Sequence, residues 1–176
     1  MSKAADWIEQ PIGRQHDRAG FDCGTPELND YLKRYARQNH ESGGAKTFVA
    51  VRAEAPGVVL GYYSISPGSI AFQKVPEDII KRLGRYEVPV YRLGRLAVAR
   101  GMQGQGLGAD LLFAAGARAI AVAQAVGGLA LAIDAKDERA ATWYRRFDAL
   151  PLLDDPLKLI LPLATIQTAL DAAKRH

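Results

Sequence analysis

The sequence predicts one mixed α/β domain, in which a sheet is flanked by helices. Short segments rich in β-branched and aromatic residues alternate with segments of helical periodicity. A glycine-rich loop joins one predicted strand to one predicted helix. A chain of 176 residues, 48% of them hydrophobic, suffices for one substantial core and is short for two. We therefore expect residues 1–176 to form a single domain.

The first predicted helix begins at Thr25-Pro26-Glu27, which supplies an N-cap oxygen, a proline for the first turn and an acid near the positive helix end. Its apolar positions recur at helical spacing and are Leu28, Tyr31, Leu32, Tyr35 and Ala36. This spacing gathers Lys33, Arg34 and Arg37 on another face. One face should pack against the core and the other should be basic.

Three strands are expected next along the chain. Residues 47–52 and 58–66 are rich in β-branched and aromatic side chains and flank a turn at Pro56-Gly57, which indicates an antiparallel hairpin. Residues 70–85 are mixed, with a short helix after Pro76, and residues 88–98 return to strand composition.

The second half of the chain alternates helices and strands. An alanine-rich helix is expected over residues 109–126, ended by Gly127-Gly128, before a buried strand at 129–134. A helix at 138–147, a strand at 157–163 and a helical tail from Ala164 should follow. Residues 111–133 are apolar, but Arg118, Gln124 and the glycine pair interrupt them, which argues against a membrane span.

The composition of the chain excludes sites that need several cysteines, but it does not identify a binding partner. The net charge of +4 suits an anionic partner without requiring one. Cys23 is the only cysteine, which rules out an intramolecular disulfide and a zinc site built on cysteine pairs, and we expect no metal. The charged start resembles no export signal, so we expect a cytoplasmic protein.

The glycine-rich loop consists of Gln103, Gly104, Gln105, Gly106, Leu107 and Gly108. Glycines before a helix let backbone N–H groups approach an anion, so a phosphate or pyrophosphate is the natural ligand. A purely structural turn is the alternative. The loop also satisfies the dinucleotide pattern G-x-G-x-x-A, but no carboxylate follows about 20 positions later, which disfavours a nicotinamide or flavin site.

The loop resembles the signature Q/R-x-x-G-x-G/A of the GNAT acetyltransferases, met by Gln103, Gly106 and Gly108 after a strand. The resemblance implies a GNAT fold, with a central twisted mixed sheet flanked by helices. It also implies an acetyl-CoA-dependent N-acetyltransferase. The expected cofactor-binding residues are Leu96, Ala97, Val98, Gln103, Gly104, Gln105, Gly106, Leu107 and Gly108, with backbone N–H groups near 96–98 holding the oxyanion.

Further blocks resemble the GNAT toxins of bacterial toxin-antitoxin pairs, at residues 21–24, 61–64, 93–98, 135–138 and 143–147. These toxins acetylate the free α-amino group on aminoacyl-tRNA and so block translation, and a ribbon-helix-helix antitoxin neutralises them. The resemblance implies the same activity and partners here, and a homodimer. One departure is Asp148-Ala149, where relatives usually have a glycine, so the loop after Phe147 is expected to differ in shape.

The resemblance assigns the general acid to Tyr144, whose hydroxyl is protonated at neutral pH and could donate to the departing thiolate. A merely packed tyrosine is the alternative, and Trp143 and Phe147 are assigned to packing. The candidate tRNA-binding residues are Lys33, Arg34, Arg37, Lys46, Arg92 and Arg95, each of which could equally be a solvated charge.

Two other functions stay open at this point. A small-molecule or protein N-acetyltransferase would share the loop and the acid. A catalytically silent CoA-binding regulatory module would keep the loop but lose nothing on removal of the Tyr144 hydroxyl.

Overall fold

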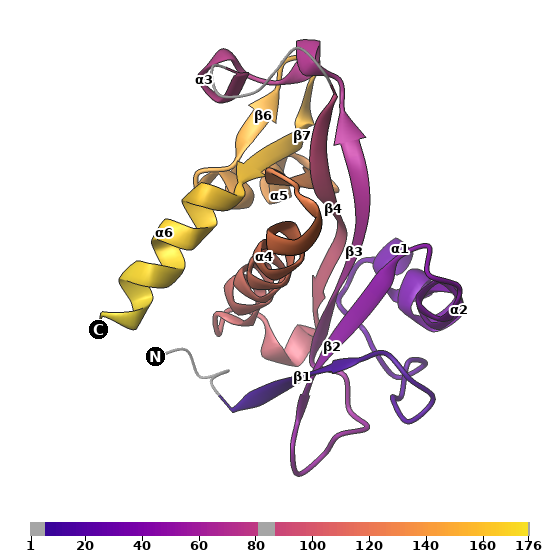
Figure 1. Ribbon diagram of the computed structural model, residues 1–176. Coiled ribbons are helices and arrows are strands. Elements are labelled where there is room, and N and C mark those ends of the chain that lie inside the picture. Colours follow the sequence, from indigo (N-terminus) through magenta and orange to yellow (C-terminus); the bar gives the residue numbers. More distant parts are fainter. Residues whose placement is uncertain (1–5, 81–86, 176) are drawn as a thin grey trace. The chain divides into compact units, whose positions relative to one another are not determined.

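Seven strands form one mixed sheet in the order β1-β2-β3-β4-β5-β7-β6 (Figure 1). The computed structural model describes residues 6–80 and 87–175. The strands are β1 (Trp7–Pro11), β2 (Lys46–Arg52), β3 (Gly61–Ile70), β4 (Val88–Val98), β5 (Ala130–Asp134), β6 (Leu150–Leu152) and β7 (Asp155–Pro162). β4 and β5 run parallel, while β1–β2, β2–β3, β5–β7 and β6–β7 are antiparallel. The predicted mixed α/β class is confirmed.

The helices within the described residues occupy the connections between strands, except α6, which follows the last strand (Figure 1). They are α1 (Pro26–Asp30), the π-helical turn η1 (Tyr31–Tyr35), α2 (Ala36–Ser42), η2 (Phe72–Lys74), α3 (Glu77–Ile80), η3 (Arg100–Met102), α4 (Leu107–Val126), α5 (Glu138–Arg145) and α6 (Leu163–Lys174). Residues 81–85 of the predicted mixed segment lie outside the described part of the chain.

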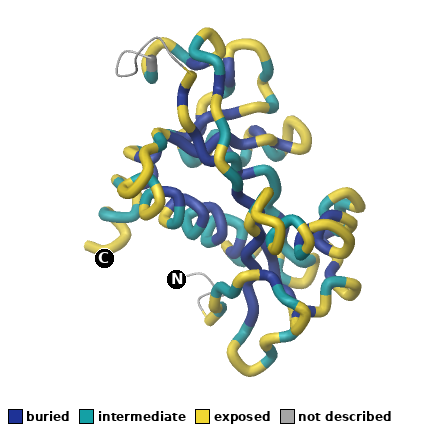
Figure 2. Tube along the Cα trace, turned by 45° about the vertical axis from the view of Figure 1, so that its right-hand side comes forward, coloured by how far each residue is buried: buried dark blue, intermediate teal, exposed yellow. Residues whose placement is uncertain are grey.

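The chain folds into two compact units, each made of two segments. Unit 1 comprises Met1–Ser66 and Arg95–Ala114, and unit 2 comprises Pro67–Gly94 and Ala115–His176. In each unit the strands carry much of the burial, as the dark blue segments of Figure 2 show, and the connecting turns are mostly exposed. The loop Gln103–Gly108 belongs to unit 1 and Tyr144 to unit 2.

Unit 1 is held together by a core between the β2–β3 hairpin and the first helical segment, and Leu32, Val49 and Tyr62 are fully buried in it. Close approach of backbone explains Gly61 at the start of β3. A Cβ there would lie 2.8 Å from the Ala97 carbonyl oxygen and 2.9 Å from Leu111 Cδ1. Only glycine fits this contact without displacing β4 or α4.

The predicted packing of Tyr35 is wrong, because the first helix is not a continuous α-helix. Its middle turn is π-helical, with the Ala36 N–H donating to the Tyr31 carbonyl oxygen five residues earlier. The wider turn rotates later residues away from the positions that α-helical spacing would give them. Tyr31 and Ala36 remain buried, whereas Tyr35 is 54% exposed beside Lys33 and Arg34.

Unit 2 packs helices against β5 and β7. Both α5 and α6 contact β7, and a Cβ on Gly116 would lie 2.7 Å from Ile166 Cγ2, so the second half of α4 approaches α6 closely at a glycine. Gly128 similarly makes room for the Tyr91 ring, whose hydroxyl donates to the Gly127 carbonyl oxygen. The glycine pair that ends α4 is thus also a packing site.

Several predicted boundaries shift for identifiable reasons. The hairpin is confirmed, but β3 begins at Gly61 instead of residue 58, because the turn folds back and the Gly57 carbonyl oxygen accepts from the Asp17 N–H at 2.8 Å. β4 has the predicted bounds. β1 and β6 were not predicted; both are short and pair with longer strands.

By length and hydropathy alone, α4 would qualify as a membrane-spanning helix, as core helices of soluble proteins also do. A membrane-spanning helix would be apolar on all sides, whereas the described residues of α4 include one buried stripe. The buried positions recur at helical spacing and are Leu107, Leu111, Leu112, Ala115 and Ala119. This stripe is the packed face of the helix, while Val122 and Val126 near its end are exposed.

Candidate active site

The glycine-rich loop of unit 1 connects β4 to α4 through the short helix η3. Gly104 and Gly106 adopt φ of 77° and 88°, which are left-handed conformations that glycine takes without strain. α4 begins at Leu107, two residues before its predicted start, so Leu107 and Gly108 lie in the first helical turn. The positive φ of Gly106 fixes this boundary, and the buried Leu107 side chain anchors it.

This geometry fits an anionic group. A Cβ on Gly104 would meet no atom within 4 Å, so the outer side of the loop is open. The first N–H groups of a helix have no intrahelical acceptor and, with the helix dipole, favour negative charge. The pyrophosphate of acetyl-CoA would be held here by the backbone of residues 104–108.

The Gln103 side chain has a structural task in this loop. Its Nε2 donates to the Val98 carbonyl oxygen and to the Cys23 carbonyl oxygen, both at 2.9 Å. The amide therefore ties the loop to the end of β4 and to a segment 80 residues earlier in the chain. We expect Gln103 to shape the loop through these two bonds, and the backbone N–H groups to contact the ligand.

Asp22 strengthens the same attachment. Its carboxylate accepts from the Gly24 N–H at 2.9 Å and from Asn29 Nδ2 at 3.0 Å, and it pairs with Arg100 Nε at 3.2 Å. The bonds from Gly24 and Asn29 lower the pKa of this carboxyl, so it stays ionised. The Arg100 N–H also donates to the Asp22 carbonyl oxygen at 2.9 Å. Residues 21–24 thus brace the turn that leads into the loop.

Tyr144 in unit 2 has a buried aromatic ring. The side chain is 6% exposed and lies against Trp143, with ring centroids 5.0 Å apart. No side chain or backbone group in the described residues hydrogen-bonds the Tyr144 oxygen. The hydroxyl is therefore able to donate to a ligand.

The surroundings of Tyr144 keep it protonated. Burial raises the pKa of the phenol, and the negative charge of Asp134 at the end of β5 raises it further. The side chain is held on α5, whose N-cap Asp137 accepts from the Ala140 N–H at 2.8 Å. The ring contact between Trp143 and Phe147, at 4.9 Å, confirms their predicted packing.

The loop after α5 keeps a glycine-like backbone at Asp148. This residue has φ of 69° and is the non-glycine residue with positive φ in the described part of the chain. Asp tolerates the left-handed region better than most residues but still with strain. The aspartate thus occupies a conformation suited to glycine.

We expect Asp148→Gly to raise the free energy of unfolding by up to about 1 kcal/mol, because it relieves this strain at some cost in unfolded-state entropy. Asp148→Ala keeps a Cβ but loses the polar side chain, and should lower stability. Chemical denaturation of the three proteins measures both changes. A destabilised glycine variant would show that the aspartate side chain contributes more than its backbone strain costs.

The candidate tRNA-binding residues differ in their surroundings. Lys33 and Arg34 are exposed, and Arg34 and Arg37 lie 3.9 and 3.6 Å from Asp30 and Glu41. Lys46 Nζ donates to the His40 carbonyl oxygen at 2.8 Å.

Arg95 and Arg92 have different surroundings again. The Arg95 guanidinium stacks on the Tyr31 ring at 3.6 Å, so this cation is oriented by an aromatic ring. The two arginines belong to different units. Arg95 lies in unit 1, as do the other four candidate residues, and Arg92 lies in unit 2.

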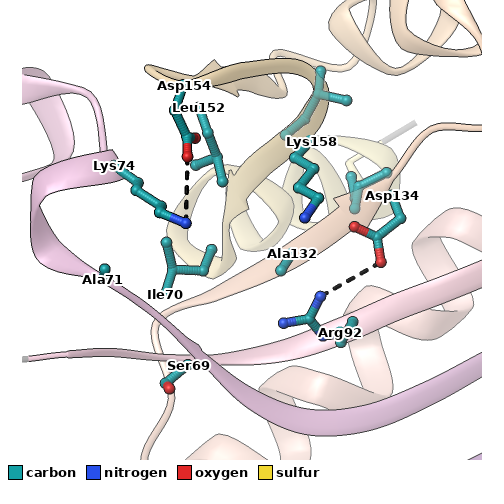
Figure 3. A pocket seen from close by; sticks show the side chains of 12 residues that line it. Ser69, Ile70, Ala71, Lys74, Arg92, Ala132, Asp134, Leu152, Asp154 and Lys158 are labelled. Atoms are coloured by element: carbon teal, nitrogen blue, oxygen red, sulfur yellow. Dashed lines mark ion pairs between the residues drawn. The ribbon is translucent and has the colours of Figure 1, made fainter.

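Arg92 lines a pocket in unit 2 that the sequence analysis did not foresee (Figure 3). The pocket has a volume of about 100 Å³ and an apolar floor that includes Ile70 and Ala132. Two ion pairs stand at its sides, Arg92 with Asp134 at 3.5 Å and Lys74 with Asp154 at 3.3 Å. Lys158 from β7 is a further lining residue. No local sequence motif announces this set, since its members come from distant segments.

The sequence profile of the acetyltransferase (GNAT) family matches residues 13–149. The chain belongs to the GNAT acetyltransferase family. This family uses acetyl-CoA, which agrees with the anion-binding geometry of the loop. The matched residues include the loop and Tyr144, and the predicted GNAT fold is confirmed.

Known relatives are toxins. The chain is 38% identical over 150 residues to the tRNA-acetylating toxin of Mycobacterium tuberculosis (strain ATCC 25618 / H37Rv), covering 85% of this chain and 88% of that protein. Among solved structures, AtaT complexed with acetyl-methionyl-tRNAfMet superposes with a TM-score of 0.86 at 27% identity, over 94% of this chain and 99% of that one.

A further solved structure contains a tyrosine-to-phenylalanine mutant of AtaT bound to the C-terminus of the antitoxin AtaR and acetyl-CoA. It has a TM-score of 0.80 at 26% identity and covers 94% and 98% of the two chains. The predicted resemblance to GNAT toxins is therefore confirmed.

Proposed function

We propose that this protein transfers acetyl from acetyl-CoA to the α-amino group of the amino acid on charged tRNA, and so blocks translation. The observation that carries the proposal is the 38% identity, over 85% of the chain, to a tRNA-acetylating toxin. A structural neighbour of nearly full coverage binds acetyl-methionyl-tRNA. The two relatives agree on the class of acceptor.

Residues 1–176 would act as one catalytic domain. The family profile matches residues 13–149 as one stretch, which supports this reading. In our proposal Gln103 shapes the loop and residues 104–108 hold the pyrophosphate through backbone N–H groups. The backbone N–H groups of Leu96, Ala97 and Val98 would stabilise the oxyanion that forms on the thioester carbonyl.

Tyr144 would act as the general acid. The neutral amine attacks the thioester carbonyl carbon, a C–N bond forms, the C–S bond breaks, and the Tyr144 hydroxyl gives its proton to the departing thiolate. The burial of the ring and the raised pKa of its hydroxyl, which stays protonated, support this role. An α-amino group has a reference pKa of about 7.7–8.0, so a sizeable neutral fraction is available to attack near pH 7. After the attack the nitrogen loses its extra proton to water, and water returns a proton to the Tyr144 oxygen.

The partners follow from the same reading. We propose a small antitoxin of ribbon-helix-helix type, a homodimer and a cytoplasmic location without membrane attachment. The complex of AtaT with the C-terminus of AtaR supports an antitoxin partner. Co-expression with the product of a neighbouring gene, followed by co-purification, would test that partner directly.

The basic face of the first helical segment should contribute to tRNA affinity through phosphate contacts. Lys33 has no ion-pair partner in the described part of the chain, and Arg37 is shared with Glu41. We expect Lys33→Ala and Arg37→Ala each to weaken tRNA acetylation and to reduce the slope of log affinity against log salt by about 1. Acetyl-CoA affinity should not change.

Lys174→Ala is the matched control, because it removes an exposed cation at the end of α6. Equal effects of all three substitutions would mean that net charge matters and that this face has no special role. Affinities at several salt concentrations, measured with uncharged tRNA, supply the slopes.

The deciding experiment incubates the protein with labelled acetyl-CoA and either charged or uncharged tRNA. Label should appear on the amino acid of charged tRNA and nowhere on uncharged tRNA. Label on a free amine or a peptide, with none on charged tRNA, would instead identify a small-molecule or protein N-acetyltransferase. No transfer to any acceptor, together with intact acetyl-CoA binding, would identify a regulatory CoA-binding module.

A further inference from the structure

We propose that the pocket of unit 2 binds one phosphodiester group of the single-stranded 3′ end of the substrate tRNA, with Lys158 as its principal contact. The inference rests on the proposed function and adds a substrate-binding site to it.

The charges around the pocket leave one cation unbalanced. Its lining contains the three cations Lys74, Arg92 and Lys158 against the two carboxylates Asp134 and Asp154, so its formal charge is +1 (three minus two). Both carboxylates are already paired, Asp134 with Arg92 and Asp154 with Lys74. The Lys158 side chain has no hydrogen bond or ion pair in the described residues.

The strand register explains why Lys158 is left over. Asp134 and Lys158 are direct cross-strand partners in the antiparallel pair β5–β7, a position at which opposite charges commonly attract. The Asp134 carboxylate instead lies 3.5 Å from Arg92 NH1 on the other neighbouring strand. Figure 3 shows Lys158 reaching into the pocket between the two ion pairs.

Arg92 has further N–H donors that can bind the same phosphodiester. A guanidinium carries five N–H donors, and the contact to Asp134 uses one side of it. Lys158 and Arg92 together can therefore donate to one oxyanion, while the apolar floor of the pocket limits its size.

A phosphodiester matches this site in charge. It carries one negative charge, equal and opposite to the surplus formal charge of the pocket lining. Lysine and arginine are the residues that most often contact nucleic-acid phosphates.

The pocket is also linked to the proposed acid. Asp134 lines it, and the charge of the same carboxylate acts on the Tyr144 phenol. A phosphate held here would anchor the acceptor end of the tRNA in the unit that also carries Tyr144, so the pocket would help to position the substrate.

The test compares three acceptors carrying the same amino acid: aminoacyl-tRNA, an aminoacylated cytidylyl-adenosine dinucleotide with one phosphodiester, and an aminoacylated adenosine with none. Lys158→Gln should lower kcat/KM about tenfold or more for the first two, because a charge-assisted bond is lost. It should leave the aminoacyl-adenosine unchanged. Lys158→Arg keeps the charge and should retain most of the activity.

Lys174→Gln, which removes a lysine of unit 2 outside the pocket, should change none of the three values. Equal losses on all three acceptors with Lys158→Gln, or no loss on any, would overturn the proposal while leaving the proposed function intact. Weaker inhibition by the antitoxin, with unchanged tRNA acetylation, would also overturn it and would indicate a partner carboxylate in the pocket.

Failure of the wild-type protein to acetylate any charged acceptor would refute the proposed function separately. The pocket then remains testable by calorimetry with the uncharged cytidylyl-adenosine dinucleotide. Lys158→Gln should lower its affinity about tenfold. Equal affinity for the wild type and the variant would count against the site.

Discussion

Tyr144→Phe should lower the rate of acetyl transfer by roughly 100-fold or more, because positioned general acids contribute about that much. Growth inhibition by the expressed protein should disappear with the activity. The fold should persist, since the hydroxyl has no hydrogen bond in the described residues and the ring stays in place. Steady-state kinetics with charged tRNA, alongside acetyl-CoA affinity and thermal stability, measure the three quantities.

Tyr91→Phe is the control for loss of a tyrosine hydroxyl in the same unit. The Tyr91 side chain is also buried, and its hydroxyl donates to the Gly127 carbonyl oxygen. Its removal should therefore cost about 1 kcal/mol of stability with the rate retained. If Tyr144→Phe keeps the wild-type rate and still arrests growth, Tyr144 is a packing residue and a different group protonates the thiolate.

Gly106→Leu should weaken acetyl-CoA binding about tenfold or more, the equivalent of losing at least one charge-assisted bond to pyrophosphate. Two effects act together. A side chain at φ of 88° strains the backbone by roughly 1–2 kcal/mol, and it also stands between the loop N–H groups and the ligand. Isothermal titration with acetyl-CoA reports the affinity, and chemical denaturation reports the strain.

Gly43→Leu separates the two effects, because Gly43 also ends a helix segment with positive φ, 85°, and has nothing within 4 Å of its would-be Cβ. This variant should lose comparable stability and keep its acetyl-CoA affinity. Unchanged affinity in Gly106→Leu would place the pyrophosphate away from this loop.

Features set by neighbouring residues could be read from the sequence alone. The bounds of β4 were predicted correctly, because β-branched and apolar composition marks that strand and a glycine-rich loop ends it. The glycine-rich loop before a helix was also predicted, and the structure adds that Gly104 and Gly106 adopt positive φ there. The same local signals predicted the hairpin β2–β3 and the alanine-rich helix α4.

The tertiary structure decided how side chains are used. The Gln103 amide bonds to carbonyl oxygens 5 and 80 residues away, and Tyr35 leaves the packed face because one turn of its helix is π-helical. The pocket joins Lys74, Arg92, Asp134 and Lys158, which no spacing along the chain relates.

The physical reason is that a local pattern fixes backbone conformation, whereas the partner of a charged or polar side chain depends on which distant strand lies beside it. Asp134 illustrates this dependence, since it has Lys158 opposite on β7 and pairs with Arg92 on β4. The arrangement of the three strands leaves the Lys158 side chain without an ion-pair partner among the described residues.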